Sequence, residues 1–261
     1  GKIDYLRAKA LMGNELGSIM PILENNPVIS WRKAVHPLLY LSFKRTQGRK
    51  VVPLDIELDT KNRLLVISGP NAGGKSVCLK TVGLLQYMLQ CGMTIPVEEG
   101  SRTGLFSDIL IDIGDEQSIE NDLRTYSSHL INMKNFIKYG SHKSLVLIDE
   151  FGTGTEPMIG GAIAEALLGE LNNMGVFGVI TTHYTNLKHY ASTTEGIING
   201  AMEFDNHLML PLFKLSIGKP GSSFAFEIAK KIGLPENILN IASTKAGVKN
   251  VNYYKALKDI A

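Results

Sequence analysis

The chain has 261 residues, 44% of them hydrophobic, and its 27 basic and 25 acidic side chains leave a net charge of +2. This composition is typical of a globular chain with a substantial core, and it excludes a disordered or collagen-like protein. The small net charge argues neither for nor against a nucleic-acid partner.

Targeting and redox features indicate a cytoplasmic protein. No stretch of about 18 apolar residues predicts a membrane span, and no signal peptide opens the chain. We expect Cys78 and Cys91, which fall in or near one predicted helix, to be reduced thiols and not a disulfide. Gly1 lies directly inside a helical pattern, which indicates a fragment of a longer protein.

The N-terminal part predicts a helix, two strands and a basic turn. Apolar spacing predicts a helix over residues 4–16, which Pro21 breaks. Residues 35–41 predict a strand entered through a proline, and residues 55–59 alternate as an edge strand does. Residues 44–50 contain four basic side chains. These could contact nucleic acid, but no aromatic residues interleave with them, which favours a solvated hairpin tip.

A glycine-rich loop then follows a buried strand. Residues 64–67 form an unbroken apolar run, which suits a strand buried on both faces. Residues 69–76, GPNAGGKS, fit the phosphate-loop pattern GxxxxGK[ST], and apolar residues at helical spacing follow them. In this motif the backbone N–H groups hold phosphate oxygens, Lys75 reaches the β- and γ-phosphates, and the Ser76 hydroxyl ligates Mg²⁺. A chance glycine-rich turn is the alternative, and the strand–loop–helix context argues against it.

The next segment predicts a strand and a helix with a hydroxyl-rich start. Residues 104–113 predict the strand, and a polar linker follows it. Residues 125–129, TYSSH, are predicted to open a helix, because hydroxyl side chains are good caps for a first helical turn.

A second apolar strand ends in two carboxylates. Residues 144–150 read SLVLIDE, and an acidic pair after a strand beside a phosphate loop is the Walker B arrangement. Asp149 would hold Mg²⁺. Glu150 would polarise the water that attacks the γ-phosphate. A capping carboxylate pair is the alternative interpretation.

A third apolar strand ends in a histidine. Thr155 is predicted to cap a helix that has Pro157 in its first turn and ends at Gly175. Residues 176–182 predict the strand. His183 would then lie at the ligand-binding edge of the sheet, either as a sensor of the γ-phosphate or as a structural histidine.

Alternating strands and helices predict an α/β fold with a mostly parallel sheet and flanking helices. Residues 201–204 and 208–215 predict a hairpin. Two short helices, over residues 224–232 and 235–242, are predicted after it. Their apolar residues would either form a dimer contact or pack on their own domain; they are Phe224, Phe226, Ile228 and Ile232.

The order of the motifs resembles one known family. SGPNAGGKS, DIGDEQSIE, TYSSHL, LVLIDEFGTGTEP, TTHYTNLK and GSSFAFEIAKKIGLPENIL together are similar to the ATPase domain of the MutS family. The resemblance covers nearly the whole chain, and it points to the second bacterial branch, whose members lack the mismatch-reading domain. It implies a P-loop NTPase fold of the ABC class. It also divides the chain into the end of a lever or core helix (1–30), the ATPase domain (31–220) and a C-terminal helix-turn-helix with its tail (221–261).

The resemblance also implies residue roles. Glu150, His183 and Lys75 would act in catalysis, and Asp149 and Ser76 would hold Mg²⁺. Residues 151–155 would form the D-loop, and Gln117 would lie near the Q-loop. The residues implied to bind ATP are Gly69, Pro70, Asn71, Ala72, Gly73, Gly74, Lys75, Ser76, Val77, Thr125, Ser127 and Ser128.

In this class the signature segment of one subunit covers the γ-phosphate held by the other. The resemblance places residues 125–129 as that segment, and therefore implies a homodimer through the ATPase face. Arg124 stands where the family usually has a serine or a similar small residue. An adenine-stacking residue would be sought at residues 51–53, with His36 as a neighbour of the base.

The implied function is Mg²⁺-dependent ATP hydrolysis that drives a DNA-transaction protein. For this branch that means binding mismatched or branched DNA, mismatch repair or suppression of homologous recombination, or action on collided ribosomes. DNA would be bound through domains missing from this fragment, and no membrane partner is expected. One alternative is a dimerising, nucleotide-gated clamp with negligible hydrolysis. The other is the ATPase subunit of a transporter, against which the chain lacks the segment LSGGQ.

Overall fold

The computed structural model describes residues 1–46, 50–70, 73–114, 122–205, 208, 210–222 and 224–246, with residues 122–125 described by their backbone alone. Its centre is a six-stranded sheet with the order β10-β9-β4-β8-β7-β6. The strands are β4 (Asn62–Ser68), β6 (Asp108–Asp112), β7 (Ser144–Ile148), β8 (Phe177–Thr181), β9 (Gly196–Asp205) and β10 (Leu210–Ile217). Only β10, at the edge, runs antiparallel to its neighbour, so the prediction of a mostly parallel sheet is confirmed.

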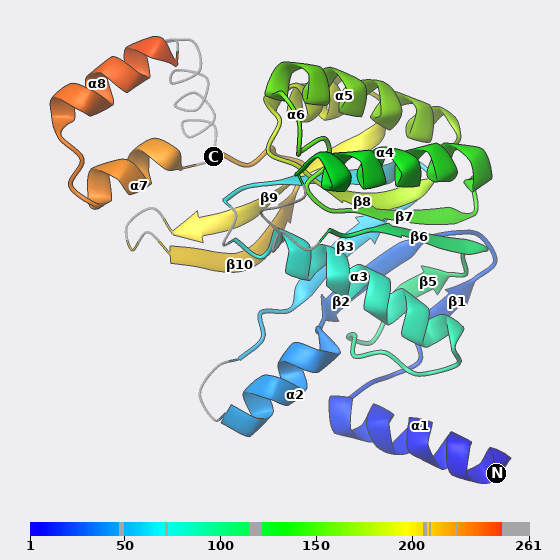
Figure 1. Cartoon of the computed structure of the whole chain (residues 1–261). Helices are drawn as coiled ribbons and strands as arrows, with labels where there is room; N and C mark the ends of the chain where they lie inside the picture. Colours follow the sequence, from blue (N-terminus) through cyan, green and yellow to red (C-terminus); the bar gives the residue numbers. More distant parts are fainter. Residues whose placement is uncertain are drawn as a thin grey trace.

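Helices cover both faces of this sheet (Figure 1). On one face lies α3 (Lys75–Gln90), and on the other lie α4 (Asp122–Tyr139), α5 (Pro157–Asn173) and α6 (Thr185–Thr193). The packing of β4 explains why its apolar run is unbroken. Leu65 and Ile67 pack in the core on the α3 side, whereas Leu64 and Val66 pack in the core below α5 and α6. The strand is buried on both faces, as its sequence predicted.

A second sheet, which the sequence did not indicate as a unit, packs on the α3 side. It has four strands in the order β1-β5-β2-β3. They are β1 (Ile22–Glu24), β2 (Ile29–Ala34), β3 (Leu54–Leu58) and β5 (Arg102–Gly104). Strand β3 lies at the edge and buries alternate residues, which confirms the edge-strand prediction. The fully buried Trp31 on β2 joins this sheet to the core around α3.

Two predictions in the N-terminal part are wrong, and a third is confirmed. Residues 35–41 are not a strand, because Pro37 begins the helix α2 (Pro37–Thr46). A proline suits the first turn of a helix, where its missing N–H would have had no intrahelical partner. The basic residues Lys44 and Arg45 belong to the last turn of α2, where they complement the helix dipole, and not to a hairpin tip. The helix predicted over residues 4–16 is confirmed as α1 (Lys2–Leu16), although Gly17 in the left-handed conformation (φ 62°) ends it and not Pro21.

Two predicted helix starts and one predicted strand are also corrected. Helix α4 begins at Asp122, so the segment TYSSH lies inside it and does not open it. Helix α5 is capped by Glu156, whose carboxylate accepts from the N–H groups of Met158 and Ile159, and not by Thr155. The strand predicted over residues 104–113 is reduced to β6, because β5 ends at Gly104 and a loop separates the two.

The C-terminal part is an antiparallel hairpin followed by two short helices, as predicted. β9 and β10 form the hairpin, and α7 (Ala225–Lys231) and α8 (Glu236–Lys245) follow. Neither helix buries a residue, and both stand apart from the sheet in Figure 1. Phe224 packs on its own chain, stacked on Phe204 with 4.7 Å between ring centroids, whereas Ile232 is 74% exposed. No described helix is both long and apolar enough to cross a membrane.

Candidate functional site

The polar segments singled out in the sequence meet at one edge of the central sheet. β4, β8 and β7 are adjacent, parallel and in register. Their carboxyl ends lead into Gly69, His183 and Asp149 respectively. Ligands of open α/β sheets bind outside the carboxyl ends of the strands, so this edge is the candidate site.

The glycine loop joins β4 to α3, which begins at Lys75. Gly69 (φ 138°) and Gly74 (φ 93°) have backbone conformations that favour glycine. A Cβ on Gly69 would also lie only 3.3 Å from the Cβ of Met202 on β9. Glycine therefore suits these positions, because the backbone of the loop passes close to the neighbouring strand β9. Asn71 and Ala72 lie outside the described residues.

Lys75 lies in the curve of this loop and is 3% exposed. Its Nζ donates to the carbonyl oxygens of Gly69 (2.9 Å) and Pro70 (3.1 Å). The ammonium is thus aimed at the loop's own backbone, at the place where the motif puts phosphate oxygens. The next residue, Ser76, is partly buried, and Val77 is exposed at 41%.

The acidic pair after β7 is held by a hydroxyl that sequence reasoning missed. Thr181, fully buried at the end of β8, donates to Oδ1 of Asp149 and accepts from the N–H of Glu150 (2.8 Å). Glu150 has a positive φ of 51°, which is uncommon for a residue with a side chain and is found at functional sites. One threonine therefore orients both carboxylate residues. In the sequence, only the place of Thr181 at the end of an apolar strand could have indicated this role.

His183 lies next to this pair. Its Nε2 is 3.9 Å from Oε1 of Glu150, and its side chain is 36% exposed. The N–H of Thr182, the preceding residue, donates to the carbonyl of Ile67 on β4 (3.0 Å), which fixes this segment beside the phosphate loop. The structure thus brings Glu150 and His183 together at the edge.

Helix α4 lies close to the loop after the acidic pair. A Cβ on Gly154 would be 3.2 Å from the Cβ of Tyr126. Ser127 and Ser128, one turn into the helix, are exposed. The side chain of Thr125, and the whole of Gln117, are outside the described part of the chain.

An ion pair holds the same helix on β6. Nδ1 of His129 lies 2.6 Å from Oδ2 of the buried Asp112, and the amide of Asn132 donates to Oδ1 of Asp112 (2.8 Å). The hydrogen bond to Asp112 raises the pKa of His129, and the carboxylates of Glu150 and Asp149 raise it further. The carbonyl of Asp112 accepts from the N–H of Asp149 (2.9 Å), so the pair lies directly behind the acidic residues.

A largely apolar hollow of about 540 Å³ opens beside Gly74 and Val77. His36, Val51 and Val52, where the sequence suggested a base site, all line it. Burial lowers the pKa of His36, which favours a neutral ring. The lining residues that sequence reasoning did not consider include Lys50, Met202, Leu210, Pro211 and Phe213.

Phe213, like Phe43, is an aromatic residue of this hollow that the sequence analysis did not find. It has a positive φ of 55°, at a register shift of β10 against β9, and its Cδ1 would be 3.1 Å from a Cβ on Gly74. The strained backbone brings its ring from an edge strand to the start of α3. Nothing in the sequence around Phe213 indicates that irregularity.

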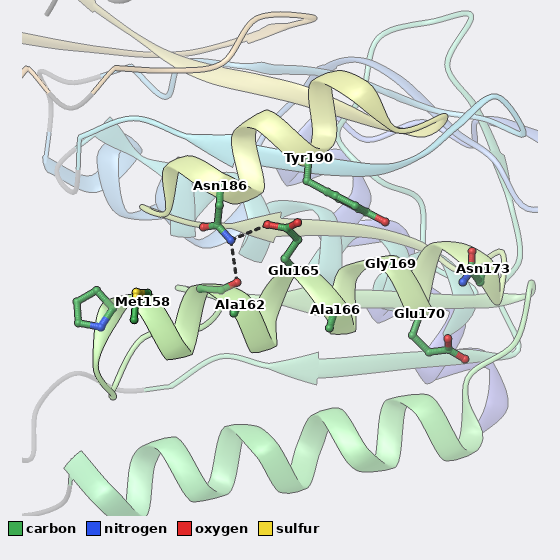
Figure 2. A pocket seen from close by; sticks show the side chains of 11 residues that line it. Met158, Ala162, Glu165, Ala166, Gly169, Glu170, Asn173, Asn186 and Tyr190 are labelled. Carbon is green, nitrogen blue, oxygen red and sulfur yellow. Dashed lines mark hydrogen bonds between the residues drawn. The ribbon is translucent and has the colours of Figure 1, made fainter. Parts of the chain in front are cut away.

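A separate groove of about 620 Å³ lies between α5 and α6 (Figure 2). Its floor contains small residues of α5, and Glu165, Glu170 and Asn186 flank it. The Asn186 amide donates to the carbonyl of Gly161 and to Glu165, both at 2.8 Å. No described residue of the glycine loop or the acidic pair lines this groove, so it is distinct from the described part of the candidate site.

The fold and the site define the class of the protein. A parallel α/β sheet, a strand–glycine loop–helix unit and an acidic pair on a nearby strand make this a phosphate-loop protein. The family described as "MutS domain V" matches residues 65–248, and the chain therefore belongs to the MutS family.

Curated relatives agree with this family. An "Endonuclease MutS2" from Enterococcus faecalis is 45% identical over 242 residues, covering 93% of this chain and 30% of the relative. Another, from Pelotomaculum thermopropionicum, is 43% identical over 260 residues, covering 100% of this chain and 32% of the relative. The chain thus spans about a third of the length of the curated relatives it matches.

Proposed function

We propose that this chain is the Mg²⁺-dependent ATPase domain of a DNA-transaction protein of the MutS family. The observation that carries the proposal is the meeting of the glycine loop, the acidic pair and His183 at the carboxyl ends of three adjacent parallel strands. We further propose that two copies share each ATP site. One copy contributes this edge, and the other contributes its exposed α4 surface.

The nucleotide would lie across the loop, with its phosphates on the backbone of residues 69–76 and its base in the apolar hollow. The hollow begins at Gly74, the residue just before Lys75. The aromatic ring of Phe213 and the neutral ring of His36 each offer a flat face on which a planar base would stack. On binding, the ammonium of Lys75 would exchange the carbonyls of Gly69 and Pro70 for phosphate oxygens.

The residues at the edge fit a magnesium ion. Mg²⁺ is usually held by one or two carboxylates together with phosphates and waters, and not by an all-protein cage. Asp149, buried and oriented by Thr181, and the hydroxyl of Ser76 would hold the ion. The ion would neutralise charge on the phosphates.

Glu150 is the group best placed to orient and polarise the attacking water. Its backbone is fixed by Thr181 and by Thr153, whose N–H and hydroxyl both donate to its carbonyl. Its carboxylate lies at the open edge beside His183. His183, by donating a hydrogen bond to the γ-phosphate, would stabilise the charge that develops there.

The second copy would supply α4. Ser127 and Ser128 are exposed, and α4 touches the loop at Gly154 that follows the acidic pair. Hydroxyl groups on an exposed helix face are suitable ligands for a phosphate held by another chain. The DNA contacts of the protein would belong to other parts of the longer relatives.

The test combines two measurements. Single-turnover hydrolysis, with Mg²⁺ and with the chain in excess over ATP, measures phosphate release, and calorimetric titration with ATP measures binding. We expect saturable binding and phosphate release by the parent chain, and neither by the Lys75→Ala variant. Binding without phosphate release would instead support a nucleotide-gated clamp, the function that Arg124 in the signature segment favours. Equal ATP affinity in the parent and the Lys75→Ala variant would overturn the assignment of the loop.

A further inference from the structure

The structure contains a buried lysine that the proposed ATPase chemistry does not use. Lys188, on α6, is only 8% exposed, and burial lowers its pKa. Lysine is almost never buried unless its ammonium has a partner. The position of Lys188 therefore indicates a specific contact in the interior.

Lys188 faces the sheet and not the outer groove. Asn186 and Tyr190, two residues before and after it on α6, point toward α5 in Figure 2. Residues two positions apart on an α-helix differ by about 200° in direction. Lys188 accordingly lies on the opposite side, where its carbonyl accepts from the amide of Asn199 on β9 (2.9 Å).

The ammonium of Lys188 holds the segment that leads to the C-terminal helices. Its Nζ donates to the carbonyl of Gly221 (3.1 Å). Gly221 belongs to residues 218–222, which follow β10 and precede the last two described helices in the chain. We call these five residues the connecting segment.

The connecting segment in turn lies against the start of the phosphate loop. The N–H of Gly221 donates to Oγ of Ser68, the last residue of β4 (2.7 Å). A Cβ on Gly221 would lie 2.6 Å from the carbonyl oxygen of Ser68 and 3.0 Å from the nitrogen of Gly69. Only a glycine fits there without a shift of one backbone or the other.

These contacts continue to the lysine of the loop. The carbonyl of Gly69, which follows Ser68, accepts from Nζ of Lys75 (2.9 Å). A contiguous set of contacts therefore runs from Lys188 through Gly221 and Ser68 to Lys75. Loosening it at one end would change the position of the loop backbone that binds phosphate.

We propose that Lys188 is a positioning residue that pins the connecting segment against the phosphate loop and so sets the nucleotide affinity of the site. This inference rests on the proposed function. The connecting segment would then also transmit movement, because any displacement of α7 and α8 that shifts Gly221 would also shift Gly69. The hydrogen bonds that link Lys188, Gly221 and Ser68 do not involve Glu150 or His183.

The main test replaces Lys188 by methionine, which keeps an unbranched side chain one atom shorter and removes the buried charge. The bond lost is a hydrogen bond from a charged donor, and we expect the Kd for ATP to rise on the order of 10-fold. We expect kcat at saturating ATP to stay close to that of the parent, because the acidic pair is untouched. The Lys188→Arg variant, which keeps a cationic donor, should recover part of the affinity.

Two further variants separate positioning from simple stability. Lys219→Met removes an exposed lysine of the same connecting segment and should leave the affinity unchanged. In Gly221→Ala the added Cβ would clash with the backbone of Ser68 and displace the connecting segment from it. This variant should therefore weaken ATP binding as Lys188→Met does. Thermal unfolding of each chain without nucleotide is measured alongside. Loss of affinity in strict proportion to loss of stability would contradict a positioning role.

Hydrogen exchange in the nucleotide-free chain tests the contacts independently of ATP. We expect faster amide exchange in residues 218–222 and 69–76 of the Lys188→Met variant, and parent rates in the Lys219→Met control. If the parent chain binds no ATP, the proposed function fails, and exchange still decides whether Lys188 holds the loop. If the parent binds ATP and the Lys188→Met and Gly221→Ala variants bind it equally well, the inference is overturned and the proposed function stands.

Discussion

Thr181 is the residue through which the two carboxylates after β7 act together. Its hydroxyl donates to Asp149 and accepts from the backbone N–H of Glu150, and the latter bond supports a backbone with φ of 51°. Two functions are thereby separated: Asp149 lies buried where an ion would be held, and Glu150 lies at the open edge. This division gives each residue its own prediction.

We expect Glu150→Gln to bind ATP with the parent affinity and to lose turnover. Glutamine keeps the shape of the side chain but polarises a water much less than a carboxylate does, and loss of such a group costs on the order of 10²–10⁴ in rate. Asp149→Asn is the comparison, because it should mainly weaken the dependence on Mg²⁺. Phosphate release by the Glu150→Gln variant at the parent rate would place the base elsewhere.

Thr181→Val should impair both catalysis and stability, with Thr181→Ser as the matched control. Valine has nearly the same shape but leaves buried groups of Asp149 and Glu150 without their hydroxyl, at a cost of about 1–3 kcal/mol in the free energy of unfolding. Misplacement of Glu150 should lower kcat by on the order of 10²-fold. Denaturant unfolding and steady-state kinetics measure the two effects. A valine variant as active as the serine variant would contradict this role.

Residue-level chemistry could be predicted from the sequence where a motif has a fixed spacing. Gly69 to Ser76 and Asp149-Glu150 fall at the expected ends of β4 and β7, because an unbroken apolar strand defines where its polar end must be. Phe213 could not be predicted, since its place depends on a register shift of β10 and a positive φ that no local pattern specifies. Thr181 was missed because a threonine at the end of a strand is common.

Helix α4 is the element that joins the acidic edge to the surface proposed for a second copy. It is held on β6 by Asp112, which bonds to both His129 and Asn132. Asp112 is buried, and its backbone also accepts from Asp149. The same carboxylate residue therefore locates the helix and the strand end behind the acidic pair.

The pKa of His129 predicts how this anchoring depends on pH. Its pKa in the folded chain is raised above the ordinary value of 6.5. The stabilisation of the folded chain by protonated His129 is thus complete below pH 6.5. It is lost as the pH rises through the raised pKa of His129 in the folded chain. His129→Asn keeps a donor near the position of Nδ1 but does not titrate. We expect the stability advantage of the parent over this variant to shrink as the pH rises from below 6.5, measured by denaturant unfolding. An advantage that grows with pH would contradict the ion pair.

Elements were predictable where they are long and buried, and less so where they are short. β4, β7 and β8 have apolar runs that only a doubly covered sheet explains. The second sheet was missed because two of its strands have only three residues each. The start of α2 was taken for a strand, since Pro37 was interpreted as the entry to a strand and not as a residue of a first helical turn.

The molecule as a whole combines a candidate nucleotide edge, an exposed α4 and two helices, α7 and α8, that bury no residue of their own. The described edge supplies the glycine loop, the acidic pair and His183. In the proposed mechanism the further donors over the γ-phosphate come from Ser127 and Ser128 of another copy. Two chains are then needed for turnover.

The most direct test of this account mixes two inactive variants, Lys75→Ala and the double variant Ser127→Ala/Ser128→Ala, and measures ATP hydrolysis. In a mixed dimer, one site combines the intact Lys75 of one chain with the intact serines of the other. We expect that neither variant alone hydrolyses ATP and that the mixture recovers part of the parent activity. No recovery on mixing, together with a specific activity of the parent that does not depend on its concentration, would contradict the shared site.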